Sequence, residues 1–255
     1  MVARRTTSDL DYSGRHMRAS LFVTCLVDQF HPEIGLGMVT VLERLGVACD
    51  FPTAQTCCGQ PAYNAGCPDE ARAVARQFLR AFRDAGHIVA PSGSCASFAK
   101  LHLPSLFEAG SPEHQDAVAI AGRLHEFSQF LVRVVGTEDV GAAFPHRVTY
   151  HDSCHLLREL GVKDEPRRLL ARVRGLELVE MTASDTCCGF GGVFSIKQPE
   201  ISTAMAADKV EHIRQSGAEC VVAGDAGCLM NIRGLMRRRG VNVKAMHLAE
   251  VLARG

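Results

Sequence analysis

The feature that most constrains this chain is a cysteine pattern that occurs twice. The eight cysteines and the glycine that follows each cysteine pair are Cys25, Cys57, Cys58, Gly59 and Cys95 in the first copy, and Cys154, Cys187, Cys188, Gly189 and Cys228 in the second. Corresponding cysteines are separated by 129, 130, 130 and 133 positions. A repeat this regular, in a residue type whose thiolate binds soft metals, predicts two related half-domains that each hold a metal centre.

The composition restricts the kind of protein that this chain can be. Its 255 residues are 47% hydrophobic, and 28 basic residues balance 28 acidic ones. A balanced charge disfavours a nucleic-acid surface or a polybasic membrane patch, and no apolar run is long enough to span a membrane. Residues 1–17 lack the apolar core of a signal peptide, so we expect a disordered tail in front of a cytoplasmic protein.

The eleven cysteines need a chemical explanation. Cytosolic thiols stay reduced, which disfavours a disulfide framework and leaves metal binding, redox chemistry, or burial as small apolar side chains. Cys49, Cys67 and Cys220 have no counterpart in the other copy. Cys49 and Cys220 lie in apolar stretches and are predicted to be buried structural thiols. For Cys67, which follows Cys58 by nine positions, burial is favoured and metal binding stays open.

Each half alternates short apolar runs with helical patterns, which predicts an α/β fold with parallel sheets. The predicted strands are 21–23, 47–51, 88–90, 148–150, 176–180 and 220–223. The predicted helices run from Pro32 to Gly46, from Glu70 to Gly86, over 165–174, and from Pro199 to Gly217. We therefore expect two pseudo-symmetric half-domains, residues 18–136 and 146–255, each a small, mostly parallel sheet flanked by helices.

These strands give the repeated cysteines a common place in the fold. In each half the three cysteine sites follow the ends of the predicted strands, and open α/β sheets bind ligands at the carboxyl ends of their strands. Three loops of one half would thus bring four thiols together. The helices that close the two halves, near 125–131 and 247–252, also resemble each other.

Four thiolates can hold one tetrahedral zinc ion or an iron–sulfur cluster. The spacing favours a cluster, because structural zinc sites commonly use Cys-x-x-Cys pairs and this sequence contains none. Consecutive cysteines fit poorly around one small ion, whereas they can bind different irons of a cluster. Gly59 and Gly189 would let backbone amides approach the cluster sulfurs, although both also suit ordinary turns. Zinc in one half stays an open alternative.

Several short motifs accompany the repeated spacing. They are Leu-Phe-Val-Thr-Cys-Leu-Val-Asp at 21–28, Thr-Cys-Cys-Gly-Gln-Pro at 56–61 and His-Asp-Ser-Cys-His at 151–155. From about residue 17 onward the chain resembles the cysteine-rich CCG domain family, which includes the cysteine-rich subunit of heterodisulfide reductase, the glycolate oxidase iron–sulfur subunit and the lactate utilization protein A branch. The likeness to the last branch is the strongest. It implies one iron–sulfur cluster per half, of the 4Fe-4S type, bound by the eight repeated cysteines.

The chain departs from the fuller family pattern at two positions. Many CCG domains end in Cys-x-x-Cys, and here Ser92 and Asp225 replace the first of those cysteines. This departure disfavours five-cysteine, non-cubane chemistry and leaves a four-thiolate centre or one with an oxygen ligand. For Asp225 a helix-capping role is favoured over ligation. His31, His151 and His155 are interpreted as groups that surround the centre or face solvent rather than as ligands.

The sequence carries no recognisable site for taking hydride from a substrate. Gly189-Phe190-Gly191-Gly192 follows cysteines rather than a strand, so it does not indicate a dinucleotide site, and no catalytic residue is predicted. The family resemblance implies an electron-transfer subunit of a complex that oxidises L-lactate or a related 2-hydroxy acid. Its implied partners resemble lactate utilization proteins B, a ferredoxin-like iron–sulfur protein, and C. A thiol–disulfide reductase subunit and a zinc-stabilised assembly scaffold stay as alternatives.

Overall fold

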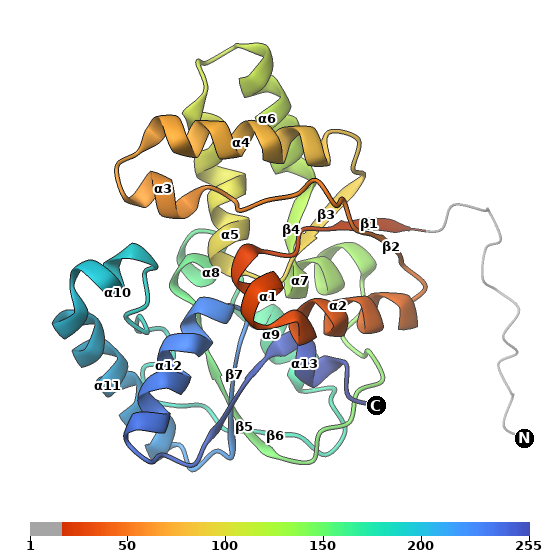
Figure 1. The fold of residues 1–255 in the computed structure, drawn as a ribbon. Helices are drawn as coiled ribbons and strands as arrows, with labels where there is room; N and C mark the ends of the chain where they lie inside the picture. Colours follow the sequence, from red (N-terminus) through yellow and green to blue (C-terminus); the bar gives the residue numbers. More distant parts are fainter. Residues whose placement is uncertain (1–16) are drawn as a thin grey trace, which may run out of the picture.

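The protein is described here by a computed structural model that covers residues 17–255. The predicted tail, residues 1–17, lies outside this range except for Met17, which packs against the core. Two sheets, one in each half of the chain, form the centres of two lobes (Figure 1). No helix in the described residues is long and apolar enough to cross a membrane.

The first sheet contains four parallel strands in the order β2-β1-β3-β4. The strands are β1 (Arg18–Leu21), β2 (Ala48–Asp50), β3 (His87–Ala90) and β4 (Leu124–Glu126). Its helices are α1 (Cys25–Phe30), α2 (Pro32–Arg44), α3 (Gln60–Asn64), α4 (Pro68–Phe82), α5 (Gly93–Ser97), α6 (Pro112–Arg123) and α7 (Phe127–Gln129). A π-helical turn (Phe98–His102) and a 3-10 turn (Leu103–Leu106) extend α5, and a π-helical turn (Phe130–Val135) extends α7.

The second sheet repeats this topology, in the order β6-β5-β7-β8 with all strands parallel. The strands are β5 (Arg147–His151), β6 (Glu177–Leu178), β7 (Cys220–Ala223) and β8 (Lys244–His247). The helices are α8 (Cys154–Arg158), α9 (Asp164–Leu170), α10 (Val193–Lys197), α11 (Pro199–Gln215), α12 (Ala226–Arg238) and α13 (Leu248–Leu252). The predicted α/β fold with two half-domains is confirmed.

Proline marks the starts of three of the longer helices: those at Pro32 and Pro199 were predicted, whereas α4 begins at Pro68, two residues before the predicted start at Glu70. Pro32, Pro68 and Pro199 occupy the first positions of α2, α4 and α11, where a missing N–H costs no helical hydrogen bond. Two strands were not predicted, because β4 and β8 read Leu-His-Glu and Lys-Ala-Met-His, without β-branched residues. The structure therefore has four strands per half instead of the predicted three.

One predicted helix is too long. The pattern favoured helix over 165–174, but α9 ends at Leu170. The N–H of Arg174 donates to the carbonyl of Ala142 at 3.0 Å, and the N–H of Phe144 donates to the carbonyl of Arg174 at 3.0 Å. The backbone at Arg174 is thus engaged by the segment that joins the halves, and this pairing ends the helix early.

The two halves share a hydrophobic core. Residues of both sheets belong to one buried cluster, including Leu21 and Val89 in the first half and Val148 and Val222 in the second. Helix α13 of the second half packs on α2 of the first, and α7 packs on α9, as the position of α13 beside α2 in Figure 1 shows. Each closing helix therefore covers the opposite half.

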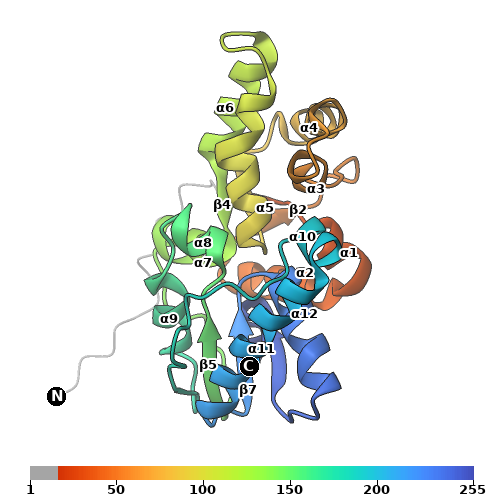
Figure 2. The same cartoon turned by 90° about the vertical axis from the view of Figure 1, so that its left-hand side faces the viewer.

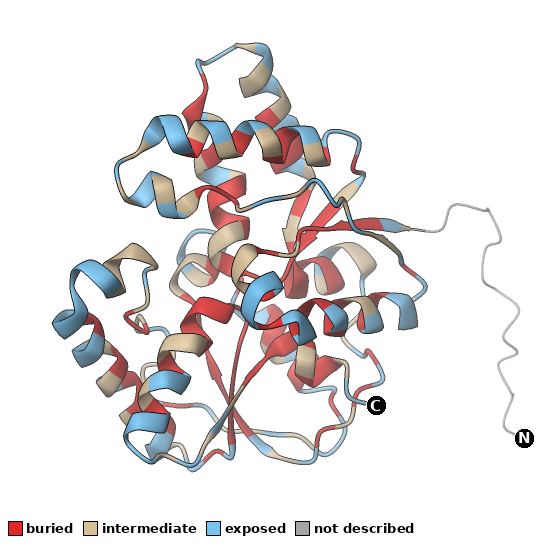
Figure 3. Cartoon of the chain, viewed as in Figure 1, coloured by how far each residue is buried: buried red, intermediate tan, exposed pale blue. Residues whose placement is uncertain are grey.

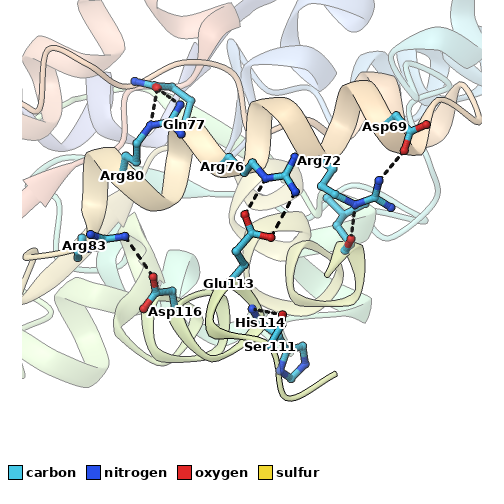
Figure 4. A network of polar contacts seen from close by, with 11 residues as sticks. Asp69, Arg72, Arg76, Gln77, Arg80, Arg83, Ser111, Glu113, His114 and Asp116 are labelled. Atoms are coloured by element: carbon cyan, nitrogen blue, oxygen red, sulfur yellow. Dashed lines mark hydrogen bonds and ion pairs between the residues drawn. The ribbon is translucent and has the colours of Figure 1, made fainter. Parts of the chain in front are cut away.

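The side view places the first half above the second, and α5 and α8 make contact at the junction (Figure 2). Buried residues follow the strands and the inner faces of the helices, and the outer faces of α4, α6 and α11 are largely exposed (Figure 3). On the outer surface, Arg76 of α4 pairs with Glu113 of α6 at 2.7 Å, and Arg83 pairs with Asp116 at 3.4 Å (Figure 4). These pairs are exposed and contribute little to stability.

Candidate metal centre

A single cavity of about 500 Å³ lies between the two halves, and all eight repeated cysteines line it. The first set is Cys25, Cys57, Cys58 and Cys95, and the second set is Cys154, Cys187, Cys188 and Cys228. The sequence predicted that each half would gather its own four thiols. It did not predict that both sets would border one space.

The fold brings each set together from three segments. Cys25 and Cys154 are the first residues of α1 and α8, directly after the carboxyl ends of β1 and β5. The pairs Cys57-Cys58 and Cys187-Cys188 lie in the loops after β2 and β6, and Cys95 and Cys228 lie in the first turns of α5 and α12. Helix N-termini favour negative charge, so these positions suit thiolates.

The first set is closely packed although its cysteines are free. The sulfurs of Cys25 and Cys57 are 3.7 Å apart, and those of Cys58 and Cys95 are 3.4 Å apart. Four sulfurs at ~2.3 Å from one tetrahedral metal ion would be separated by about 3.8 Å. The two printed contacts are therefore short enough for thiolates that bind a common metal centre, and they are equally those of neighbouring free thiols in contact.

The second set is arranged in the same way and includes a histidine. The sulfurs of Cys188 and Cys228 and one ring nitrogen of His151 all lie within 4.8 Å of one another. A hydrogen bond with Cys188 lowers the pKa of Cys228 to about 7, and His151 acts in the same direction. His155 contributes Nδ1 at 3.5 Å from the sulfur of Cys154.

The thiols of the first three positions in each set change one another's pKa in the same directions in both halves. Hydrogen bonds from Cys25 and Cys58 lower the pKa of Cys57 to about 2, and the same contacts raise the pKa of Cys25 and Cys58. The equivalent thiols lower the pKa of Cys187 to about 2. The pKa is thus lowered for Cys57 in the first set and for Cys187 and Cys228 in the second, and metal binding would displace the remaining protons.

Glycine allows the backbone to approach the sulfurs in both loops. The N–H of Gly59 donates to the sulfur of Cys57 at 3.5 Å, and the N–H of Gly189 donates to that of Cys187 at 3.4 Å. Both glycines have positive φ, +96° and +82°, a conformation that L-residues with a side chain rarely adopt. Backbone amides aimed at thiolates are one means by which a protein adjusts the potential of an iron–sulfur centre.

Ser92 and Asp225 both cap helices at the cavity. The hydroxyl of Ser92 accepts from the N–H of Cys95 at 3.3 Å, and Oδ1 of Asp225 accepts from the N–H of Gly227 at 3.1 Å. Oδ2 of Asp225 accepts from the hydroxyls of Ser92 and Ser94 at 3.1 and 2.7 Å, and from the N–H of Ser94 at 2.9 Å. The carboxylate therefore links the two halves, a role beyond the cap that the sequence favoured.

The other cysteines lie away from the cavity lining. Cys220 is buried on β7, as predicted, whereas Cys49 on β2 is only half-buried, because β2 lies at the edge of its sheet. Burial raises the pKa of Cys220 to about 12 and that of Cys49 to about 11. Cys67 precedes α4 and is also half-buried. His31 pairs with Glu33 at 3.0 Å and does not line the cavity.

Sequence reasoning missed one residue close to the second set of cysteines and one part of the cavity wall. Lys209 is fully buried within α11 and does not line the cavity, but its charge acts on the thiols of Cys188 and Cys228. The sequence offered no signal for it, because a single lysine on a helix usually faces solvent. The missed part of the wall is the segment at the mouth of the cavity, where Gly191, Val193 and Ile196 contribute to the lining. Ile196 on α10 is 80% exposed, so this wall presents apolar surface to solvent.

Comparisons with known proteins agree with the repeat. The CCG cysteine-rich domain family matches residues 19–99 and 148–233. A solved structure of a hypothetical protein from Helicobacter pylori superposes with a TM-score of 0.61 at 12% identity, covering 94% of this chain and 49% of that one. This chain thus spans about half the length of that protein, and the likeness shows the fold alone.

Curated relatives are much closer in sequence. Lactate utilization protein A of Geobacillus kaustophilus is 51% identical over 92% of this chain and 98% of its own length. The protein of the same name from Oceanobacillus iheyensis is 48% identical over 92% and 96%, and lactate utilization protein A 2 of Bacillus cereus is 44% identical over 94% and 99%. The chain belongs to the cysteine-rich CCG domain family and, within it, to the lactate utilization protein A family.

Proposed function

We propose that the chain is an iron–sulfur redox subunit of a complex that oxidises L-lactate or a related 2-hydroxy acid. In this proposal each set of four cysteines holds one cluster of the 4Fe-4S type, and the chain passes electrons between partner proteins in the cytoplasm. The observation that carries the proposal is that two sets of four thiols border one cavity, with close sulfur contacts in the first set and between Cys188 and Cys228 in the second. The names of the relatives supply the substrate class.

The chemistry of the donor set supports a cluster in each half. All the repeated donors are sulfur, and thiolates bind iron–sulfur clusters as well as zinc. In the first half the two consecutive cysteines have different neighbours: Cys57 contacts Cys25, while Cys58 contacts Cys95. Consecutive cysteines with different neighbours suit a group of several metal ions, because in a 4Fe-4S cluster each iron takes one thiolate and the two could bind different irons.

An electron relay also needs access to partners. Oxidation of a 2-hydroxy acid removes two electrons and two protons, which a separate group in a substrate pocket must accept. We assign that group to the partners, which would resemble lactate utilization proteins B and C. Thiolate-bound metal centres commonly transfer single electrons, so this chain would receive electrons and pass them on.

A second candidate function is that of a thiol–disulfide reductase component. The observation that favours it is the volume of the shared cavity, about 500 Å³, which is within the range of small-molecule sites. The replacement of a fifth cysteine by Ser92 and Asp225 counts against it, because both side chains are occupied by hydrogen bonds. A zinc-stabilised scaffold is the third candidate. Metal analysis distinguishes it from the other two, because it would contain zinc instead of iron and sulfide.

The test combines genetics with an assay of the isolated protein. Deletion of this chain in a strain without another lactate dehydrogenase should abolish growth on L-lactate, and expression of the intact chain should restore it. The purified chain should not oxidise lactate with an artificial electron acceptor, whereas the complex reconstituted with its partners should. Normal growth of the deletion strain would refute the pathway assignment, and rapid turnover by the isolated chain would refute the role as one component of a complex.

A further inference from the structure

The two halves can be aligned residue by residue around the cysteines. Phe22 precedes Cys25 by three positions, and His151 precedes Cys154 by three. The buried faces of α4 and α11 also correspond, with every pair 131 positions apart. The pairs are Ala71 and Ser202, Ala75 and Ala206, Phe78 and Lys209, Leu79 and Val210, and Phe82 and Ile213. Phe22 and Phe78 of the first half are therefore replaced by His151 and Lys209 in the second.

Behind the first set of cysteines the wall is apolar. Phe22 and Phe78 are fully buried, with ring centroids 4.9 Å apart in an edge-to-face arrangement. Phe82 adds a third ring, 5.6 Å from that of Phe22. Cys58 belongs to the same buried hydrophobic cluster. An extra electron on a metal centre here would meet no cation and no side-chain donor from these positions.

Behind the second set, the polar side chain of His151 is buried beside the cysteines. Its side chain is fully buried, and apart from the thiol of Cys228, whose pKa it helps to lower, neither ring nitrogen has a hydrogen-bond partner among the described residues. Leaving a buried N–H unpaired is unfavourable. Because one ring nitrogen lies within 4.8 Å of the sulfurs of Cys188 and Cys228, a group bound by these cysteines would supply the missing partner.

Lys209 adds a positive charge to the same wall. It is fully buried, and its Nζ donates to the carbonyls of Ala183 and Ser184 at 2.6 and 3.1 Å. Burial lowers its pKa, while Cys188 and Asp152 act in the opposite direction. The nearby carboxylate of Asp152 is itself held by Arg167.

Both carboxylate oxygens of Asp152 accept hydrogen bonds from Arg167, at 2.7 and 2.9 Å. This bidentate pair balances the charge of Asp152 locally. In the first half Val23 occupies the position of Asp152. That position of the first half therefore carries no carboxylate that an arginine would have to pair with. The charge of Lys209 acts on the thiols of Cys188 and Cys228 as well as on the carboxylates of Asp152 and Asp185.

We propose that the two redox centres are inequivalent, and that the second centre is reduced first because His151 and Lys209 stabilise its added electron. This inference rests on the proposed iron–sulfur function. Reduction adds one electron and makes a centre more negative, so an imidazole N–H donor and a nearby lysine ammonium favour the reduced form. The reductant in the complex is the 2-hydroxy acid oxidised by a partner, and electrons received by this chain collect in its second half.

The experiment is an anaerobic redox titration of the full chain, followed by EPR, with dithionite as reductant. The wild type should show two signals with separate midpoint potentials. His151→Phe copies the residue of the first half and should lower only the higher potential, and Lys209→Met should do the same. Phe22→Leu is the matched control, because it keeps the first wall apolar, and it should leave both potentials in place.

The possible outcomes test this inference and the proposed iron–sulfur function separately. Absence of iron from the purified chain would refute the proposed function itself. Two iron centres that titrate together, or that keep their potentials in both His151→Phe and Lys209→Met, would overturn the inequivalence alone. If His151→Phe loses the iron of the second set, the imidazole is a ligand of that centre. Lys209→Met is then the deciding variant, and an unchanged midpoint potential of the second centre in it refutes the inference.

Discussion

At the scale of single residues, the second half carries polar groups where the first is apolar, and the junction of the halves carries a buried carboxyl group. Glu126, which ends β4, is fully buried. Its Oε2 accepts from the N–H groups of Ser128 and Gln129 at 2.8 and 3.2 Å, while Oε1 has no partner among the described residues. Burial raises the pKa of Glu126 from 4.5 to about 7.

Glu126 should make the stability of the protein depend on pH. A raised carboxyl pKa means that the fold favours the protonated form, so this contribution is complete below pH 4.5 and is lost as the pH rises through about 7. Glu126→Gln keeps an acceptor for the cap and removes the charge. At pH 8 it should raise the free energy of unfolding by up to about 3 kcal/mol, whereas at pH 4.5 it should have little effect.

Anaerobic thermal denaturation of the two proteins at pH 5 and pH 8 measures this difference. The gap between their melting temperatures should open only at the higher pH. A gap of equal size at both pH values would show that Glu126 does not change its protonation state in this range.

At the scale of elements, the loops that carry the cysteine pairs depend on glycine to different degrees. A Cβ at Gly189 would lie 2.5 Å from the carbonyl oxygen of Ser202 on α11, whereas one at Gly59 would meet its nearest atom, the carbonyl oxygen of Ala71, at 3.4 Å. Both positions have positive φ. Gly189→Ala therefore combines backbone strain with a clash against a rigid helix.

Gly189→Ala should lower the melting temperature more than Gly59→Ala does, and it should deplete iron from the second set. Gly59→Ala should cost about 1–2 kcal/mol, the strain of a left-handed conformation without a clash. Iron content and thermal denaturation of both variants, prepared side by side without oxygen, measure the difference. Equal losses in the two variants would mean that α11 moves freely away from the loop.

Sequence predicted the elements whose signals are local. The proline starts of α2 and α11 and the existence of strands before Cys25 and Cys154 follow from patterns within a few residues. The strands β4 and β8 were not predicted, because their short sequences have no strand preference. They form because β3 and β7 each offer a free edge for pairing. The early end of α9 at Leu170 likewise depends on pairing of Arg174 with a distant segment.

The candidate site was predictable in part for the same reason. The repeat alone indicates the eight cysteines, because residue type and spacing can be read directly from the sequence. The shared cavity depends on how two halves dock, which no spacing in one half reveals. Lys209 was missed because a helical stripe of mostly apolar residues predicts burial against a core, and one lysine in it resembles a solvated position.

At the scale of the whole molecule, the closing helices hold the two halves together. A Cβ at Gly37 of α2 would lie 2.8 Å from the carbonyl oxygen of Ala249 on α13, so the two helices approach each other at this glycine. Gly35, on the same helix, would place its Cβ 3.6 Å from the side chain of Val23, an ordinary contact. Substitution of each glycine by alanine therefore separates two effects on stability: the higher helix propensity of alanine, which acts at both positions, and the contact between α2 and α13, which only Gly37 makes.

Gly37→Ala should destabilise the protein, because it forces α13 away from α2 and loosens the cavity between the halves. Gly35→Ala should instead stabilise it by up to about 1 kcal/mol, the usual gain of alanine over glycine inside a helix. Thermal denaturation of both variants under anaerobic conditions measures the effects. Stabilisation by Gly37→Ala would show that the halves do not dock through these helices.

The central claim is that each set of four cysteines binds its own iron–sulfur centre. The most direct measurement is the iron, zinc and acid-labile sulfide content of the anaerobically purified chain, with EPR, in the wild type and in Cys58→Ser and Cys188→Ser, which alter equivalent buried cysteines. The account predicts iron and sulfide in about equal amounts, with about half lost in each variant and a different EPR signal removed by each. Zinc without sulfide, or complete loss of iron in both variants, would contradict it.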